Sequence, residues 1–371
     1  MFNFVQAQKF KDAVTFVPNK TEPIHNWFYY KEGFSKQLAD FFIKQFNLTN
    51  TSLVFDPFMG TGTTLLSCKQ QSISSIGIDV NPLLVFVSKV KTTDYDLVSL
   101  EEIVKKAGSW KFERPKDIPK DPFYKKAFSR FSLEDMVFLR NKIGEIEKPE
   151  EREFLLLALI DSAVKGSYTY KDGAVLKIFK NPRPPVRKLF KNKIHRMLKD
   201  LQRNPLPKAI AKAEDGDARS LQLKDEIVDA VITSPPYLNK IEYTKVYRLE
   251  NSLLGLNSQP MLPSHIGSKA ERTIEGLESL PIAAQTYFAD MSLVLAELHR
   301  VCKPSAQLAV VVGGGCFPTQ AVNADEILAS TAEKTGFNVE SILVARNSWC
   351  TRARTIKVGQ IRESIIILRK P

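Results

Sequence analysis

The chain has 371 residues, of which 43% are hydrophobic, and carries a formal net charge of +12 at pH 7. This length allows two domains or one domain with a long insertion, and no apolar run approaches the ~18 residues that a membrane span requires. The N-terminus lacks the basic-then-apolar order of a signal peptide. The four cysteines include no CxxC pair, which disfavours a disulfide framework and a zinc site. We therefore expect a cytoplasmic protein without a membrane anchor or a metal.

The first part of the chain alternates strands and helices. Helical apolar spacing over residues 34–46 precedes a strand over 52–56, a Gly-rich turn over 57–64, a helix over 65–71 and a second strand over 75–79. A strand, helix and strand in this order predict a βαβ unit of a parallel sheet. The carboxyl ends of both strands should then meet at one edge, where open α/β sheets bind ligands.

Residues 83–212 interrupt this alternation, and apolar spacing there predicts helices over 133–146, 151–164 and 186–201. Basic residues crowd the stretch from 165 to 203, which contains only two acidic residues. Tyrosine and phenylalanine are interleaved with them, as on surfaces that grip a nucleic-acid backbone. The net charge alone would also fit a merely soluble basic protein, but that alternative does not explain the clustering.

The strand pattern resumes after this insertion. We predict a helix over residues 283–302 and strands over 211–218, 227–234, 307–312, 339–345 and 363–369. The whole chain is therefore expected to form one α/β sheet with a long insertion.

The segment Ser234-Pro235-Pro236-Tyr237 follows the apolar strand over 227–232. Two consecutive prolines must end that strand, because neither donates a ladder hydrogen bond and each fixes φ. The resulting corner offers a hydroxyl, backbone carbonyls that no ladder uses, and an aromatic face. Together these groups can hold a planar ring by its amino edge. We predict that Ser234, Pro235, Pro236 and Tyr237 are the catalytic residues.

The Gly-rich turn is a second candidate site. Gly60 and Gly62 stand where the backbone must approach a ligand closely or take a positive φ. The turn departs from the GxGxxG pattern of dinucleotide enzymes, since a third glycine is missing and Asp56 precedes it. Asp79 ends the next strand, where a carboxylate can accept both ribose hydroxyls, and Asp217 can meet an adenine amine. The alternatives are an exposed cap for Asp79 and an ordinary turn aspartate for Asp217.

In this order, the motifs resemble those of the amino-methyltransferases of DNA, which use S-adenosylmethionine. Residues 56–64 (DPFMGTGTT) are similar to the family's cofactor loop, 77–82 (GIDVNP) to its ribose-binding segment and 233–237 (TSPPY) to its catalytic motif. Residues 25–35 resemble the segment that closes over the methionine end of the cofactor. The resemblance implies a Rossmann-like seven-stranded mixed sheet with helices on both faces and a long, mainly helical basic insertion.

The resemblance also divides the chain and assigns residues. We expect the cofactor half over residues 1–92, a helical basic insertion for target recognition over 93–205 and the catalytic half over 206–371. The residues expected to bind the cofactor are Trp27, Phe28, Asp56, Pro57, Phe58, Gly60, Gly62, Thr63, Asp79, Val80, Asp217 and Ala218. For Trp27 and Phe28, packing in the core is an equal alternative. The residues expected to contact DNA are Lys177, Lys180, Arg183, Arg187, Lys188 and Arg196.

The expected chemistry follows from the groups at the corner. An exocyclic amine is a poor nucleophile, because its lone pair is delocalised into the ring. Acceptors at Ser234 Oγ and the Pro235 carbonyl would aim that lone pair at the sulfonium methyl group. The base must first leave the helix stack, and Tyr237 is expected to stack on it. A serine hydroxyl is a weak base, so we expect the amine proton to leave to water.

Serine at the first motif position resembles the cytosine-N4 branch, whereas aspartate or asparagine is usual for adenine-N6. The cofactor half comes first here, which departs from the commonest cytosine-N4 order. We expect a site-specific cytosine-N4 methyltransferase of double-stranded DNA in a restriction-modification or related defence system, with a cognate endonuclease as candidate partner. The alternatives are adenine-N6 in DNA, a base in RNA, a nicotinamide oxidoreductase that leaves the corner unexplained, and a non-catalytic nucleic-acid binder.

Overall fold

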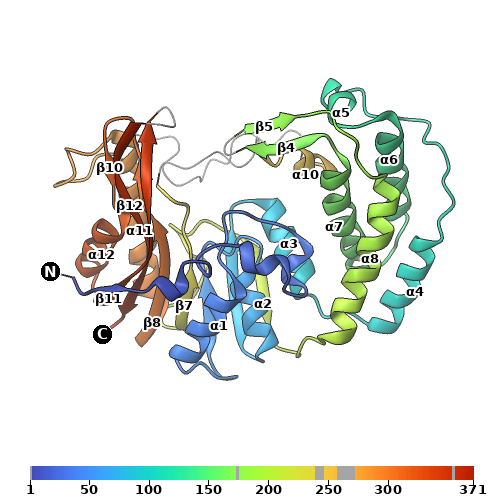
Figure 1. Cartoon of the computed structure of the whole chain (residues 1–371). Coiled ribbons are helices and arrows are strands. Elements are labelled where there is room, and N and C mark those ends of the chain that lie inside the picture. The colour runs from blue at the N-terminus through green and yellow to red at the C-terminus, as the bar shows by residue number, and fades with distance from the viewer. Residues whose placement is uncertain (1, 173–174, 239–245, 257–271, 353–355) are drawn as a thin grey trace.

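The computed structural model of the chain describes residues 2–172, 175–238, 246–256, 272–352 and 356–371. Its centre is an eight-stranded mixed sheet with the order β1-β11-β12-β8-β7-β2-β3-β6 (Figure 1). β12 is antiparallel to both of its neighbours, and the other neighbouring strands are parallel. The strands are β1 (Phe4–Gln6), β2 (Leu53–Asp56), β3 (Ser74–Asp79), β6 (Ala211–Asp215), β7 (Val228–Thr233), β8 (Cys302–Gly313), β11 (Asn338–Arg352) and β12 (Ile356–Arg369).

This architecture confirms the Rossmann-like α/β fold class, with one strand more than expected. The extra strand is β1, which pairs in parallel with β11 from Phe4 opposite Ile342 to Gln6 opposite Val344. All three β1 side chains are exposed, so no apolar alternation in the sequence marks them as a strand. β1 covers a sheet edge that would otherwise present unpaired backbone groups.

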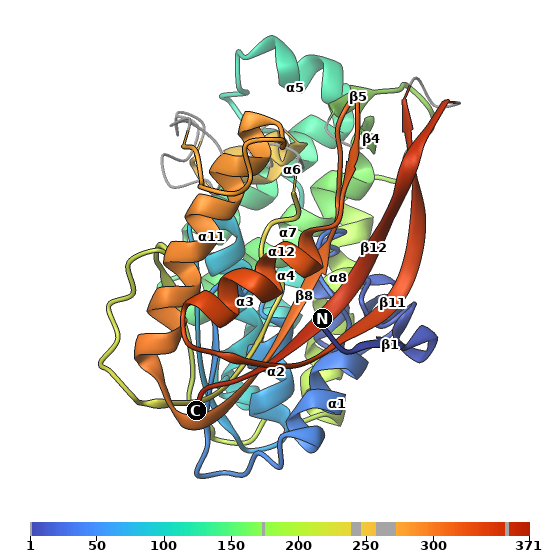
Figure 2. The ribbon, with the colours of Figure 1, turned by 90° about the vertical axis from the view of Figure 1, so that its left-hand side faces the viewer.

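The central strands β7 and β8 are buried on both faces. Val231 and Leu308 pack with α11 (Ile282–Val301) and α12 (Ala324–Lys334), whereas their neighbours Ile232 and Ala309 pack with α1 (Lys36–Gln45) and α2 (Thr63–Gln70). Figure 2 shows α11 and α1 on opposite sides of the sheet. A parallel strand covered on both faces needs apolar residues at almost every position, which explains the apolar run that predicted β7.

A mainly helical part lies beside the sheet, on the right of Figure 1. It contains α4 (Leu97–Gly108), α5 (Pro122–Ala127), α6 (Arg130–Gly144), α7 (Pro149–Gly166), the hairpin β4 (Thr169–Asp172) and β5 (Val175–Ile178), and α8 (Val186–Arg203). Its buried side chains form one apolar cluster with α3 (Pro82–Thr92), α10 (Arg248–Leu253) and residues 16–30. The helical part and the cofactor half therefore share a core.

The predicted helices over 133–146, 151–164 and 186–201 are confirmed as α6, α7 and α8. Helix α4 was not predicted, although its buried side chains repeat with helical spacing. The β4–β5 hairpin was not predicted either, because most of its side chains are exposed and no apolar alternation marks it.

The cysteines need one correction. Cys316, in the short strand β9 (Gly315–Cys316), and Cys350 on β11 form a disulfide, with their Cα atoms 5.4 Å apart. Their 34-residue separation gave no sequence signal, because tertiary packing of β9 against β11 brings them together. Within the described residues, no cluster of His, Cys, Asp and Glu could hold a metal ion, and no helix is long and apolar enough to cross a membrane.

We expect Gly62→Ala to lower the free energy of unfolding by about 2–4 kcal/mol. Gly62 has a φ of +75°, and an added Cβ would lie 2.2 Å from Ser88 Oγ and 3.3 Å from the Ser88 Cα. Urea denaturation measures the change. Gly144→Ala is the matched control, because nothing lies within 4 Å of its added Cβ. The control should be neutral or stabilising, because alanine favours a helix over glycine by up to ~1 kcal/mol. Equal unfolding curves for wild type and Gly62→Ala would contradict this account.

Candidate active site

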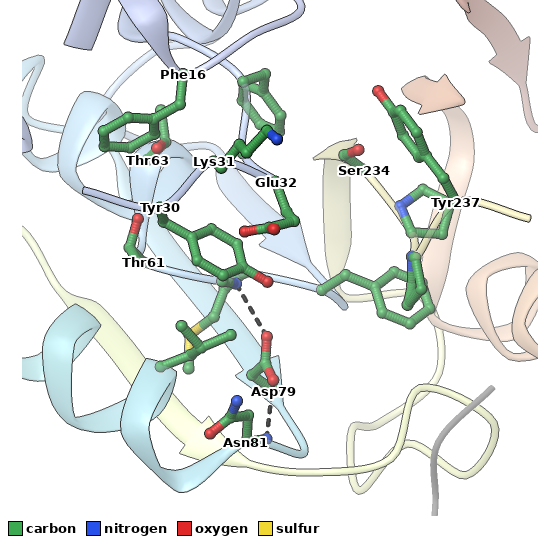
Figure 3. Close-up of a pocket in the computed structure, with 18 of the residues that line it drawn as sticks. Phe16, Tyr30, Lys31, Glu32, Thr61, Thr63, Asp79, Asn81, Ser234 and Tyr237 are labelled. Atoms are coloured by element: carbon green, nitrogen blue, oxygen red, sulfur yellow. Dashed lines mark hydrogen bonds between the residues drawn. The ribbon is translucent and has the colours of Figure 1, made fainter. Parts of the chain in front are cut away.

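A cavity of about 410 Å³ opens where β2, β3, β6 and β7 end (Figure 3). This is the edge at which open α/β sheets bind ligands. The lining combines turns after these strands with an N-terminal segment and with two side chains from β11 and β12. Its members are residues 14–17, 29–34, 57–61, 79–81 and 216–218, with Thr63, Leu84, Ser234, Pro235, Pro236, Tyr237, Arg346 and Glu363.

Asp56 joins the two halves of the site from beneath the cavity. Its carboxylate, 1% exposed, accepts hydrogen bonds from Thr233 Oγ1 at 2.6 Å and from Thr64 Oγ1 at 2.8 Å. The backbone N–H of Phe58 adds a third at 3.1 Å. Burial raises the pKa of Asp56 to about 6 although these three donors lower it. Asp56 does not line the cavity, so its position suits it to fix the Gly-rich turn against the end of β7.

Asp79 lines the cavity at the end of β3. Its carboxylate accepts from the backbone N–H of Gly60 at 3.1 Å and from that of Asn81 at 2.8 Å (Figure 3). Burial raises the pKa of Asp79 to about 7, and these two hydrogen bonds partly offset the rise. A carboxylate with lone pairs left after two backbone bonds can accept further hydroxyl donors in the cavity.

The Gly-rich turn wraps around this carboxylate. Pro57, Phe58, Gly60 and Thr63 line the cavity as predicted for a cofactor turn, and Val80 joins them from the end of β3. Gly62 does not line it; this residue precedes α2 and packs against α3 instead.

Asp217 and Ala218 line the cavity beyond β6. The Asp217 carboxylate is also tied to Arg219, whose Nη2 donates to it at 2.7 Å and whose backbone N–H donates at 3.0 Å. Partial burial opposes ionisation of Asp217, but the hydrogen bonds from Arg219 keep its pKa below the usual value. Arg219 in turn reaches Asp290 on α11 at 3.2 Å, which fixes this wall of the cavity to the helix behind it.

The corner after β7 places Ser234, Pro235, Pro236 and Tyr237 in the lining opposite Asp79 (Figure 3). The Tyr237 phenol donates to Glu363 Oε1 at 2.6 Å. Burial raises the pKa of Tyr237 well above its usual value, and the negative charge of Glu363 raises it further. The corner thus presents a hydroxyl and a fixed neutral phenol to the cavity.

Trp27 and Phe28 lie outside the cavity lining, in the core shared with the helical part. Trp27 donates from Nε1 to Asp200 on α8 at 2.9 Å and packs edge-on against Phe154. From this N-terminal part of the chain, Phe16, Tyr29, Tyr30 and Phe34 line the cavity instead. Residue type could not separate these aromatic side chains, because the direction of each is set by the fold.

The six residues predicted to contact DNA lie in the helical part, away from the cavity lining. Lys177 is exposed on β5 and pairs with Asp172 at 2.6 Å, and Arg187 on α8 pairs with Asp135. Lys180, Arg183, Lys188 and Arg196 are exposed. The β4–β5 hairpin stands at the same end of the molecule as the C-terminal end of β11 and the N-terminal end of β12 (Figures 1 and 2). Most of the predicted residues cluster near this hairpin, whereas Arg196 lies further along α8.

The chain is similar in sequence to known DNA methyltransferases. A family model described as DNA methylase matches residues 7–89. The Type II methyltransferase M.BsoBI of Geobacillus stearothermophilus is 26% identical over 97% of this chain and 88% of that protein. The Type II methyltransferase M.AvaI of Nostoc sp. strain PCC 7120 is 27% identical over 100% of this chain and 93% of that protein. Among solved structures, a SAM-dependent methyltransferase of Methanosarcina mazei aligns over 89% of this chain and 96% of that one, with 11% identity and a TM-score of 0.35.

The DNA methylase match spans the N-terminal segment and the Gly-rich turn, and the alignments with the Type II methyltransferases extend over the catalytic corner. S-adenosylmethionine is the cofactor of this family, and the family's motifs meet here around one cavity. The chain is similar to the S-adenosylmethionine-dependent amino-methyltransferases of DNA in its N-terminal segment, and to Type II methyltransferases along nearly its whole length.

Proposed function

We propose that the chain is a site-specific methyltransferase that acts on the exocyclic N4 amine of cytosine in double-stranded DNA. The observation that carries the proposal is the position of Ser234, which lines the cavity on the side opposite Asp79. Serine at this motif position resembles the cytosine-N4 branch. The names of the relatives, both Type II methyltransferases, support a role in a restriction-modification or related defence system. A cognate endonuclease in the cytoplasm is then the candidate partner.

The residues of the cavity fit S-adenosylmethionine. A volume of about 410 Å³ lies within the range of small-molecule sites. The Asp79 carboxylate can accept from both ribose hydroxyls, while Asp217 and Ala218 border the place for the adenine ring. A Cβ on Gly60 would lie 3.3 Å from the Tyr30 ring, so glycine keeps the turn open to the methionine end. Bound there, the cofactor supplies an electrophilic methyl group on a sulfonium ion.

The chain's own groups then act on the amine. Ser234 Oγ and a backbone carbonyl of the corner accept hydrogen bonds from the two N–H groups of the target amine. These bonds withdraw the nitrogen lone pair from conjugation with the ring. Tyr237 stacks on the flipped base and excludes water from one face. Catalysis by this arrangement rests on orientation and electrostatics. The proton leaves to water, because none of these groups is a strong base.

We also propose residues 93–205 as the part that recognises the target, between a cofactor half over 1–92 and a catalytic half over 206–371. The exposed aromatic side chains Tyr170 and Phe179 stand among the basic residues of the β4–β5 hairpin. Basic and aromatic groups together suit contact with phosphates and with unstacked bases.

We expect binding of S-adenosylmethionine to strengthen as the pH rises from 6 to 8. The pKa of Asp79 is about 7, so its carboxyl is mainly protonated below this pH and mainly an ionised acceptor above it. Asp79→Asn should weaken binding about tenfold or more at pH 8 and remove most of this pH dependence. Isothermal titration calorimetry measures both effects. Asp117→Asn is the control, because Asp117 is exposed and lies outside the cavity lining. A pH-independent wild-type affinity would refute this role.

Incubation of duplex DNA with labelled S-adenosylmethionine should yield N4-methylcytosine, detected by nucleoside mass spectrometry. Ser234→Ala should lower kcat about 10²–10³-fold, because it removes one hydrogen-bond partner of the reacting amine. Its affinity for S-adenosylmethionine should stay within about twofold. N6-methyladenine as the sole product would overturn the cytosine assignment. Methylation of RNA in preference to DNA would overturn the assignment of DNA as the substrate.

We expect a triple variant in which glutamine replaces Lys180, Arg183 and Lys188 to bind DNA more weakly. The affinity of this variant should also depend less steeply on salt concentration. Each phosphate that the variant no longer neutralises should reduce the slope of log K against log salt concentration by ~0.9. Fluorescence anisotropy at several salt concentrations measures the slope. The control replaces Lys44, Lys224 and Lys334, which are also exposed, lie outside residues 93–205 and change the net charge equally. If both triple variants change the slope equally, the proposed surface is wrong.

A further inference from the structure

Tyr237 lies against a group of three residues, Gly313, Arg346 and Glu363. Its phenol donates to Glu363 Oε1 at 2.6 Å, and Arg346 Nε donates to the other carboxylate oxygen, Oε2. A Cβ added to Gly313 would lie 2.5 Å from Cδ2 of the Tyr237 ring. Glycine at this position is therefore what allows the ring to lie against the backbone of β8.

Strand register brings these three residues together. Glu363 on β12 is paired with Gly313 on β8 and with Arg346 on β11. The three residues therefore occupy one level across three neighbouring strands, whose spacing is about 4.8 Å. Both Arg346 and Glu363 line the cavity, and Glu363 is only 8% exposed. Tyr237 thus meets backbone beneath its ring and a carboxylate at its hydroxyl.

An ionised carboxylate only accepts hydrogen bonds, whereas a serine hydroxyl can donate or accept. Glu363 therefore requires the Tyr237 phenol to act as donor and leaves the phenol oxygen with lone pairs. Ser234 lies beside Tyr237 in the cavity lining (Figure 3). A hydrogen bond with Ser234 partly offsets the rise in the pKa of Tyr237, which is the effect of a donor to the phenol oxygen. If the Ser234 hydroxyl donates to the phenol oxygen, its own lone pairs face the incoming amine.

We propose that Glu363, held by Arg346, is a positioning residue of the methyl transfer: it fixes the Tyr237 ring on Gly313 and, through the phenol, directs Ser234 to accept from the target amine. The inference rests on the proposed roles of Ser234 and Tyr237 in the transfer. It applies whichever base carries the amine. It also explains how a serine, which could donate to the amine's lone pair, is kept as an acceptor.

The test is a double-mutant cycle of Glu363→Gln and Tyr237→Phe, measured as the single-turnover rate of methyl transfer to duplex DNA. Glutamine can turn an amide N–H toward the phenol and so removes the obligatory acceptor, while phenylalanine keeps the ring and removes the hydroxyl. Each single variant should lower the rate about tenfold without raising the KM for S-adenosylmethionine. The rate of the double variant should lie within about twofold of the rate of the slower single variant. The two losses should not multiply, because both changes break the same chain of hydrogen bonds.

The matched control is Glu340→Gln. Glu340 also pairs with an arginine across β11 and β12, Arg369, but lies outside the cavity lining. Its rate should equal that of wild type. Loss of a surface ion pair should change stability by at most ~1 kcal/mol.

Three results would overturn the proposal. They are a wild-type rate for folded Glu363→Gln, a roughly hundredfold loss in the double variant, and a wild-type rate for Tyr237→Phe. The last result decides the matter even if Glu363→Gln does not fold, because the phenol is the link that the proposal requires. Failure of the proposed function looks different: wild type would transfer no methyl group to DNA, or Ser234→Ala would keep the full rate.

Discussion

The site depends on one buried carboxylate, that of Asp56. Two parallel strands, β2 and β7, end side by side, and each must turn away from the sheet into a loop that lines the cavity. Asp56 accepts from the first loop through Phe58 N–H and Thr64, and from the end of β7 through Thr233. Burial alone disfavours the charged form, so the three donors are what make ionisation at neutral pH compatible with this position. Thr64 Oγ1 also donates to the Ile232 carbonyl at 3.0 Å, so Asp56 and Thr64 together anchor the two loops to each other.

Much of this arrangement could be predicted from the sequence, because it follows from strand ends. A βαβ unit places Asp56 and Asp79 at the same sheet edge, and two prolines force Ser234 and Tyr237 to turn out at that edge too. These are local rules, and they work because the polar residues follow apolar runs directly. The resemblance to a known family then supplied the chemistry that the residues alone left open. The choice of base still rests on Ser234.

The rest could not be predicted, because it is set by strand register and by packing. Glu363 is 126 residues from Tyr237, and nothing near it in the sequence marks it as part of a site. Gly313 begins a run of three glycines after a strand, which indicates a tight loop near the site but does not show that the Tyr237 ring packs on its first residue. Trp27 is of a residue type that is common in pocket walls. Its indole N–H nevertheless donates to Asp200 on α8, and its ring packs against Phe154 in the core. Sequence patterns indicate which residues are buried, but they do not show which neighbour each will meet.

The same packing joins the basic helical part to the cofactor cavity. Lys193 on α8 donates to the Trp27 carbonyl at 2.8 Å, and Lys91 on α3 donates to the carbonyls of His25 at 3.1 Å and Thr61 at 3.2 Å. Burial lowers the pKa of Lys91 to about 7, and repulsion from Lys193 lowers it further. Two buried lysines thus hold the N-terminal segment against the cofactor turn and against α8 at once. Any displacement of α8 would have to strain these bonds, so the surface that we propose for target recognition is mechanically coupled to the cavity.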